Sequence, residues 1–268
     1  MRILRVIFIF AIVVSTAAAG LVTATAAHAA GEVNYVALGD SYSSGVGAGD
    51  YISSSGSCER STKAYPEQWA GVNSPDSFVS VACSGASTAD VLGSQVSALS
   101  ASTTLVSITI GGNDAGFASV METCILLPTR WCLNAVAAAK AFIATQLPGR
   151  LDQTLQTIAA DAPNATIVVL DYPDLYDLSK SGSCVGLSTS DRTALDQGAD
   201  ALDSAIQAAA LANGDTFADV RGQFAGHEIC DSNSWLHAVD IFALSSSYHP
   251  TAAGQDQGYL PVFTGAAD

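Results

Sequence analysis

Short apolar runs recur along the chain, and each is followed by glycine or polar residues. They are rich in Val, Ile, Thr and Phe. Runs of this length and composition are typical of strands buried on both faces of a parallel sheet. The sequence therefore predicts strands at residues 34–38, 77–81, 105–110, 166–170 and 216–220.

Segments with helical periodicity lie between these runs. A first helix is expected over residues 88–99. A second is expected from Leu147 to Ile158, where leucines recur at helical spacing. Ser190 can cap a third, which ends at Asn213-Gly214. Alternation of strands and helices predicts one doubly wound α/β domain with a central parallel sheet.

The N-terminus has the pattern of an export signal. Arg2 and Arg5 precede an apolar run at residues 6–14, and small residues continue to Ala29. A basic start, an apolar run and an Ala-x-Ala site are typical of a secretory signal peptide. We expect residues 1–29 to be removed, leaving residues 30–268 as a single secreted, extracellular domain. An uncleaved membrane helix is the alternative, which the small-residue cleavage site disfavours, so no stable membrane anchor is expected.

Composition narrows the class of protein. Acidic residues outnumber basic ones 25 to 10, and the formal charge is −15. This leaves too few basic side chains for the positive face that nucleic-acid binding requires. With 49% apolar and 13% charged residues, the chain is neither disordered nor a coiled coil.

All six cysteines follow the signal, which favours disulfides over free thiols. Their spacing does not match a zinc site, so no metal is expected. Six cysteines allow 15 connectivities, and the sequence does not choose among them. Nearest-neighbour pairing closes the shortest loops and is the one we favour: Cys58–Cys83, Cys124–Cys132 and Cys184–Cys230.

Candidate chemistry lies just after the strands, where ligands bind in such folds. Ser41 follows the first strand, Gly85 the second and Asn113 the third, and His249 lies near the C-terminus. A serine hydroxyl needs a base such as histidine to become a nucleophile. The N–H groups of Ser41 and Gly85 and the Asn113 amide could stabilise the oxyanion that forms. This set of residues points to acyl transfer.

These blocks resemble the SGNH hydrolases, also called GDSL esterases and lipases. The resemblance is closest to the secreted actinobacterial lipases and esterases. It rests on YVALGDSYSSG (35–45), ITIGGNDAGF (108–117) and SYHPT (247–251), and it covers essentially all of the mature chain. It implies a flavodoxin-like three-layer α/β/α sandwich and esterase or lipase activity without a cofactor.

Site residues follow from the resemblance by position. Ser41 would be the nucleophile and His249 the general base, while Gly85 and Asn113 would join the Ser41 N–H in the oxyanion hole. Most relatives carry an acid three residues before the histidine, where this chain has Ser246. We therefore expect a dyad in which the Ser246 backbone carbonyl orients the imidazole. Asp240 is the nearest acidic alternative.

Two rival motifs remain. Residues 85–89 approximate a nucleophile elbow, which would make Ser87 the nucleophile. The glycines at residues 45–49 follow a strand, but their spacing is not that of a dinucleotide-binding loop. The elbow would leave the Asn113 block unexplained, and no helix clearly starts at the glycine-rich segment.

The sequence thus predicts a monomeric serine esterase or lipase acting on a small-molecule or lipid ester. The alternatives are a phospholipase or carbohydrate O-deacetylase of the same fold, and a non-catalytic binding domain.

Overall fold

Five parallel strands form the centre of the protein. The computed structural model describes residues 32–180, 184, 186–240 and 244–267. The sheet order β2-β1-β3-β4-β5 is that of flavodoxin-like folds, so the expected fold class is confirmed. The strand bounds are Asn34–Gly39 (β1), Ser77–Ser80 (β2), Leu105–Thr109 (β3), Thr166–Leu170 (β4) and Thr216–Ala218 (β5).

The strand register brings the carboxyl ends to one edge of the sheet. β1 pairs with β2 on one side and with β3 on the other, so that Gly39 lies opposite Thr109. Every residue of β3 is buried, and so is every residue of β4 after Thr166. Residues that follow β1, β3 and β4 therefore lie close together at the carboxyl edge of the sheet, although long stretches of chain separate them.

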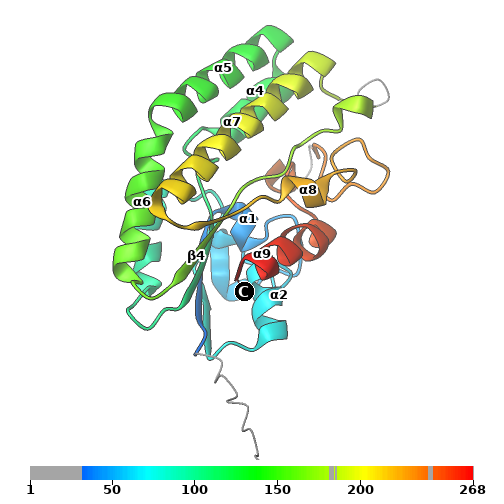
Figure 1. Cartoon of the computed structure of the whole chain (residues 1–268). Helices are drawn as coiled ribbons and strands as arrows, with labels where there is room; N and C mark the ends of the chain where they lie inside the picture. The colour runs from blue at the N-terminus through cyan, green and yellow to red at the C-terminus, as the bar shows by residue number, and fades with distance from the viewer. Residues whose placement is uncertain (1–31, 181–183, 185, 241–243, 268) are drawn as a thin grey trace, which may run out of the picture. The chain divides into compact units, whose positions relative to one another are not determined.

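Helices cover both faces of the sheet (Figure 1). α2 and α9 pack together on one face; α3, α6 and α7 lie on the other, where α4 and α5 extend the layer. The helix bounds are Ser41–Ser44 (α1), Tyr65–Asn73 (α2), Thr88–Gly93 (α3), Phe117–Leu126 (α4), Thr129–Thr145 (α5), Leu147–Asp161 (α6), Thr189–Asn213 (α7), Arg221–Phe224 (α8) and Leu260–Ala267 (α9).

Two helix predictions differ from the structure. The helix expected over residues 88–99 ends at Gly93, and a short 3₁₀ helix follows. The cause is Gln95, whose buried side chain exchanges hydrogen bonds with the backbone N–H and carbonyl of Gly39. α7 is capped by Ser188 rather than Ser190, because Ser188 and Asp191 form a capping box.

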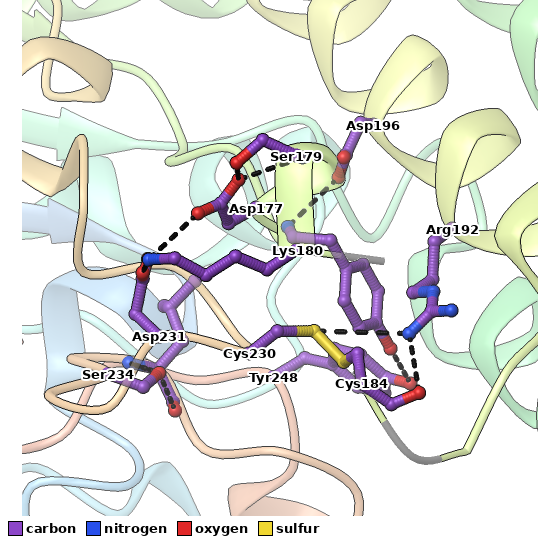
Figure 2. Close-up of a disulfide and its surroundings, with 12 residues drawn as sticks. Asp177, Ser179, Lys180, Cys184, Arg192, Asp196, Cys230, Asp231, Ser234 and Tyr248 are labelled. Carbon is purple, nitrogen blue, oxygen red and sulfur yellow. Dashed lines mark hydrogen bonds and ion pairs between the residues drawn. A yellow bond between two sulfur atoms is a disulfide. The ribbon is translucent and has the colours of Figure 1, made fainter. Parts of the chain in front are cut away.

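The six cysteines form the three nearest-neighbour pairs. Cys184–Cys230 ties the segment before α7 to the C-terminal part of the chain (Figure 2). Within the described residues, no helix is long and apolar enough to cross a membrane. The expected signal at residues 1–29 lies outside them.

Candidate active site

Ser41 occupies a sharp turn between β1 and α1. Gly39 makes this turn with φ +117°, and a Cβ there would lie 2.4 Å from the Thr109 carbonyl oxygen. Only glycine fits such a backbone and so close an approach. Ser41 is the first residue of α1, and 7% of its surface is exposed. The turn thus presents its hydroxyl at the carboxyl edge of the sheet.

The buried Asp40 carboxylate holds this turn in place through hydrogen bonds. Its Oδ1 accepts hydrogen bonds from the Tyr42 N–H at 3.0 Å and the Thr109 hydroxyl at 2.8 Å. Its Oδ2 accepts one from the Tyr172 hydroxyl at 2.5 Å. Burial raises the pKa of Asp40 to about 6, and these donors oppose that rise. Tyr172 also accepts the Gly112 N–H, so Asp40 connects the ends of three strands.

His249 faces the Ser41 hydroxyl. Its Nε2 lies 2.8 Å from Ser41 Oγ, and its Nδ1 lies 3.1 Å from the carbonyl oxygen of Ser247. A carbonyl oxygen only accepts, so Nδ1 holds the ring proton and Nε2 offers its lone pair to the serine. Figure 2 shows the region behind this loop, where Tyr248 packs near the Cys184–Cys230 disulfide.

The orienting carbonyl belongs to Ser247, which corrects the expectation that it would come from Ser246. The Ser246 oxygen instead accepts the backbone N–H of His249 at 3.1 Å. The shift follows from Tyr248, whose backbone is left-handed with φ +67°. This conformation turns the chain directly before His249. The imidazole Nδ1 then lies next to the Ser247 carbonyl.

Several contacts hold Tyr248 in this uncommon backbone conformation. Its carbonyl accepts the Tyr42 hydroxyl at 2.8 Å, and its N–H donates to the His237 carbonyl. Its own hydroxyl lies 2.8 Å from that of Tyr176. A non-glycine residue at positive φ persists only where its surroundings fix it. The loop therefore supplies His249 in a single, well-determined position.

The protein around the ring keeps His249 neutral. Desolvation lowers the pKa of the imidazole to about 4, and the hydrogen bond to Ser247 opposes the change only partly. A charged imidazolium loses hydration there, and the partner of its Nδ1 is a carbonyl rather than a carboxylate. His249 is thus in the form that accepts a proton over the neutral and mildly acidic range.

Three residues that carry potential hydrogen-bond donors line the groove at Ser41. Among the described hydrogen bonds, none is donated by the backbone N–H of Ser41 or Gly85. Asn113 donates one amide hydrogen to the Ala86 carbonyl at 2.9 Å, which orients its side chain. Ser41, Gly85, Asn113 and His249 all line one open groove. The residues expected to form an oxyanion hole are therefore brought together.

The Gly85 loop is anchored through Cys83. Cys83 forms a disulfide with Cys58 and donates its N–H to the Gly39 carbonyl. Gly85 itself has φ +78°, and a Cβ there would meet nothing within 4 Å. Glycine is thus needed here for its backbone conformation rather than for space.

Two hollows meet at Ser41. The groove is open and lies between α4 and the segment at residues 244–249. The second hollow, here called the cavity, is lined by apolar side chains of α4, α5 and α7 and by residues that follow β1, β3 and β4. Ser41, Asn113, Phe117 and Met121 line both hollows. Ser41 therefore lies where an open groove meets a more enclosed cavity, and both contain many apolar side chains.

The rival motifs have other roles in the structure. Ser87 donates its hydroxyl to the Asp90 carboxylate at 2.6 Å and caps α3. Gly47 packs under the histidine loop, and a Cβ there would lie 2.7 Å from the Pro250 carbonyl oxygen. Asp240 donates its N–H to the Ser247 hydroxyl, and the acceptor for His249 Nδ1 is a backbone carbonyl.

Sequence reasoning missed Tyr172 as part of the site. It follows β4 closely, at the same edge of the sheet as Ser41, and its hydroxyl joins Asp40 to Gly112. The signal that could have found it is this position after a buried strand.

Within the described residues, no group of acidic, histidine or cysteine side chains could hold a metal ion.

Comparisons with known proteins agree with this geometry. The model of the GDSL-like Lipase/Acylhydrolase family matches residues 37–257. Lipase 1 of Streptomyces coelicolor is 52% identical over 262 residues, or 97% of each chain. The crystal structure of phospholipase A1 from Streptomyces albidoflavus has a TM-score of 0.86 and 54% identity, covering 88% of this chain and 100% of that one. The extracellular lipase from Streptomyces rimosus has a TM-score of 0.85 and 52% identity, covering 87% and 99%.

The lowered pKa of His249 can be measured directly. Because burial disfavours the imidazolium, we expect the ring to stay neutral as pH falls from 7 and to gain its proton only near pH 4. NMR of protein labelled at histidine, titrated between pH 3.5 and 8 and assigned with a His249→Gln variant, gives the value. A midpoint near the ordinary ~6.5 would contradict the desolvated environment described above.

Proposed function

Because the chain belongs to the GDSL-like lipase/acylhydrolase family and is a carboxylic ester hydrolase, we propose that it hydrolyses lipid esters through an acyl-enzyme on Ser41. His249 is the general base in this scheme. The observation that carries the proposal is the 2.8 Å contact between His249 Nε2 and Ser41 Oγ, with Nδ1 held by a carbonyl. This pairing leaves the lone pair of Nε2 directed at the serine proton.

In the first half of the reaction, Ser41 Oγ attacks the ester carbonyl as its proton moves to His249 Nε2. The carbonyl oxygen becomes an oxyanion, which the Ser41 and Gly85 N–H groups and the Asn113 amide stabilise. The tetrahedral intermediate then expels the alcohol, which takes the proton from His249. The products of this half are the free alcohol and an ester on Ser41.

In the second half, water attacks the acyl-enzyme and gives its proton to His249. The same donors stabilise the second oxyanion, and Ser41 regains its proton as the carboxylic acid leaves. Imidazolium forms twice without a carboxylate partner. The Ser247 carbonyl and the protein dipoles around the ring are the groups that support it.

Surface chemistry supports a lipid substrate over an acetylated sugar. Large apolar side chains are exposed beside the groove, including Leu126 at 67% and Leu244 at 62%, and both line it. Leu127, Trp131 and Leu133 continue the exposed apolar surface from α4 into α5. Exposed apolar surface next to a binding groove is typical of contact with lipid. The relatives named as lipases and phospholipase A1 agree with this substrate class.

We expect Ser41→Ala to lose nearly all turnover of p-nitrophenyl esters, while Ser87→Ala keeps most of it. The reason is that Ser41 contacts His249, whereas Ser87 caps α3. Loss of a triad nucleophile in comparable enzymes reduces turnover by about 10⁶. A serine-directed phosphonate should label Ser41 in the wild type. Labelling of Ser87 would replace this scheme with an elbow mechanism, and an absence of both labelling and hydrolysis would favour a binding domain.

The carbonyl-oriented dyad predicts that no nearby carboxylate is required. Ser246→Ala and Asp240→Asn should each retain most of the turnover, since neither removes the Ser247 carbonyl. In a true triad, the change from acid to amide costs about 10⁴ in turnover. A loss of that size for Asp240→Asn, with an unchanged circular dichroism spectrum, would make Asp240 a third member.

Export is part of the proposal. The pattern of residues 1–29 and the three disulfides support secretion, and one relative is named an extracellular lipase. Protein recovered from the culture medium of an expressing bacterium should begin at Ala30 when its N-terminus is sequenced. Retention of the intact N-terminus in a membrane fraction would instead indicate an uncleaved anchor.

A further inference from the structure

We propose that Tyr176 is a positioning residue for His249. Its hydroxyl holds Tyr248 in the backbone conformation that aims the imidazole, while Arg192 and the Cys184–Cys230 disulfide hold Tyr176 in turn. Helix α7 and this disulfide thereby determine where the base lies, although neither belongs to the catalytic pair. The inference rests on the function proposed above, because it concerns the base of that reaction.

Tyr248 is the residue through which Tyr176 acts. Its side chain is buried, and its hydroxyl lies 2.8 Å from that of Tyr176. Among the described hydrogen bonds, this is the one that the Tyr248 side chain makes. A buried hydroxyl without a partner is costly, so the pair fixes where the Tyr248 side chain lies. Fixing that side chain also favours the left-handed backbone that places His249 against Ser41.

The backbone of Tyr176 is fixed without help from the loop at residues 244–249. Its N–H donates to Asp196 Oδ1 on α7 at 3.2 Å, and the Leu175 N–H donates to the same oxygen at 3.1 Å. Tyr176 also pairs with Ile229 in an isolated parallel bridge. Tyr176 is therefore a fixed point against which the loop that carries the base can be held.

Arg192 restrains the ring of Tyr176. Its guanidinium carbon lies 5.9 Å from the centre of that ring, and Arg192 is buried. A cation removed from water is attracted to the face of an aromatic ring. Arg192 Nη1 also donates to the Cys184 carbonyl at 3.0 Å, beside the Cys184–Cys230 disulfide (Figure 2). The guanidinium thus links the ring of Tyr176 to the disulfide.

These residues act on the base rather than on the substrate. Neither Tyr176 nor Arg192 is among the described residues that line the groove or the cavity, whereas Tyr248 and His249 both line the groove. A change at Tyr176 therefore leaves the walls of both hollows in place and alters how His249 Nε2 meets the Ser41 hydroxyl. Such a change slows the chemical step and leaves substrate binding largely unchanged.

Tyr176→Phe tests this role, because it removes one hydroxyl and keeps the ring. We expect it to lower kcat for p-nitrophenyl butyrate by at least about tenfold and to leave KM close to the wild-type value. The matched control is Tyr35→Phe, since Tyr35 is also buried and its hydroxyl lies 2.6 Å from Ser107 Oγ in the core. Tyr35→Phe should lower the melting temperature but keep kcat. A wild-type kcat in Tyr176→Phe would overturn the proposal.

A spectroscopic measurement follows the base itself. NMR of protein labelled at histidine gives the tautomer of His249, which should be the Nδ1–H form in the wild type because Nδ1 faces the Ser247 carbonyl. Tyr176→Phe should give a mixture of tautomers at neutral pH, whereas Tyr35→Phe should keep the wild-type signals. A single Nδ1–H tautomer in Tyr176→Phe would contradict the positioning role.

A double variant shows whether the two tyrosines act through one contact. Tyr176→Phe combined with Tyr248→Phe should cost no more turnover than the worse single change, because both remove the same hydrogen bond. Tyr248→Phe also replaces Tyr176→Phe if that variant fails to fold. Additive losses in the double variant would overturn the proposal.

Removal of the disulfide tests the far end of these contacts. Cys184→Ser/Cys230→Ser should lower kcat without raising KM, and Tyr176→Phe should then add little further loss. Arg192→Lys replaces the cysteine variant if that fails to fold, since lysine lacks the planar group that reaches both the ring and the carbonyl. A wild-type kcat would overturn the part assigned to Arg192 and the disulfide. Absence of all ester hydrolysis by the wild type would instead refute the proposed function, while the tautomer of His249 would still test the positioning.

Discussion

The active-site edge depends on one buried carboxylate. Asp40 is 1% exposed, and it accepts hydrogen bonds from groups that follow β1, end β3 and follow β4. A buried carboxylate is costly unless such donors surround it. The need to satisfy both oxygens therefore holds the three strand ends together, and Ser41 follows Asp40 directly in the chain. Removing any one donor would leave a carboxylate oxygen unsatisfied and loosen the turn that presents the Ser41 hydroxyl.

The position of His249 depends instead on the backbone conformation of Tyr248. The left-handed residue Tyr248 turns the chain so that His249 reaches Ser41, and tyrosine hydroxyls hold that turn. This arrangement replaces the usual acid with a neutral acceptor. A neutral acceptor fixes the tautomer but gives little support to imidazolium, which agrees with the lowered pKa of His249. The neutral His249 ring and its neutral carbonyl partner therefore agree with each other, and His249 is the base in the proposed mechanism.

Much of the fold and site followed from the sequence for a physical reason. Buried strands leave continuous apolar runs, and in a parallel sheet the residues after those runs must share an edge. The proximity of Ser41, Gly85 and Asn113 was predicted in this way, and the SYHPT block supplied His249; the four residues line one groove. Nearest-neighbour pairing of the cysteines likewise needed only short loops.

Features set by distant contacts could not be predicted. The break after Gly93 exists because Gln95 bonds to Gly39, which lies 56 residues away. The choice of Ser247 over Ser246 depends on one positive φ at Tyr248, and residue spacing carries no information about it. The hydrophobic pattern records burial, whereas both of these features depend on where a polar partner lies. The contact between Ser41 and His249 spans 208 residues, so in the proposed mechanism an emerging chain is inactive until nearly all of it has been synthesised and its last loop has docked. Ester hydrolysis during refolding will accordingly report completion of the native topology, not the earlier formation of individual helices.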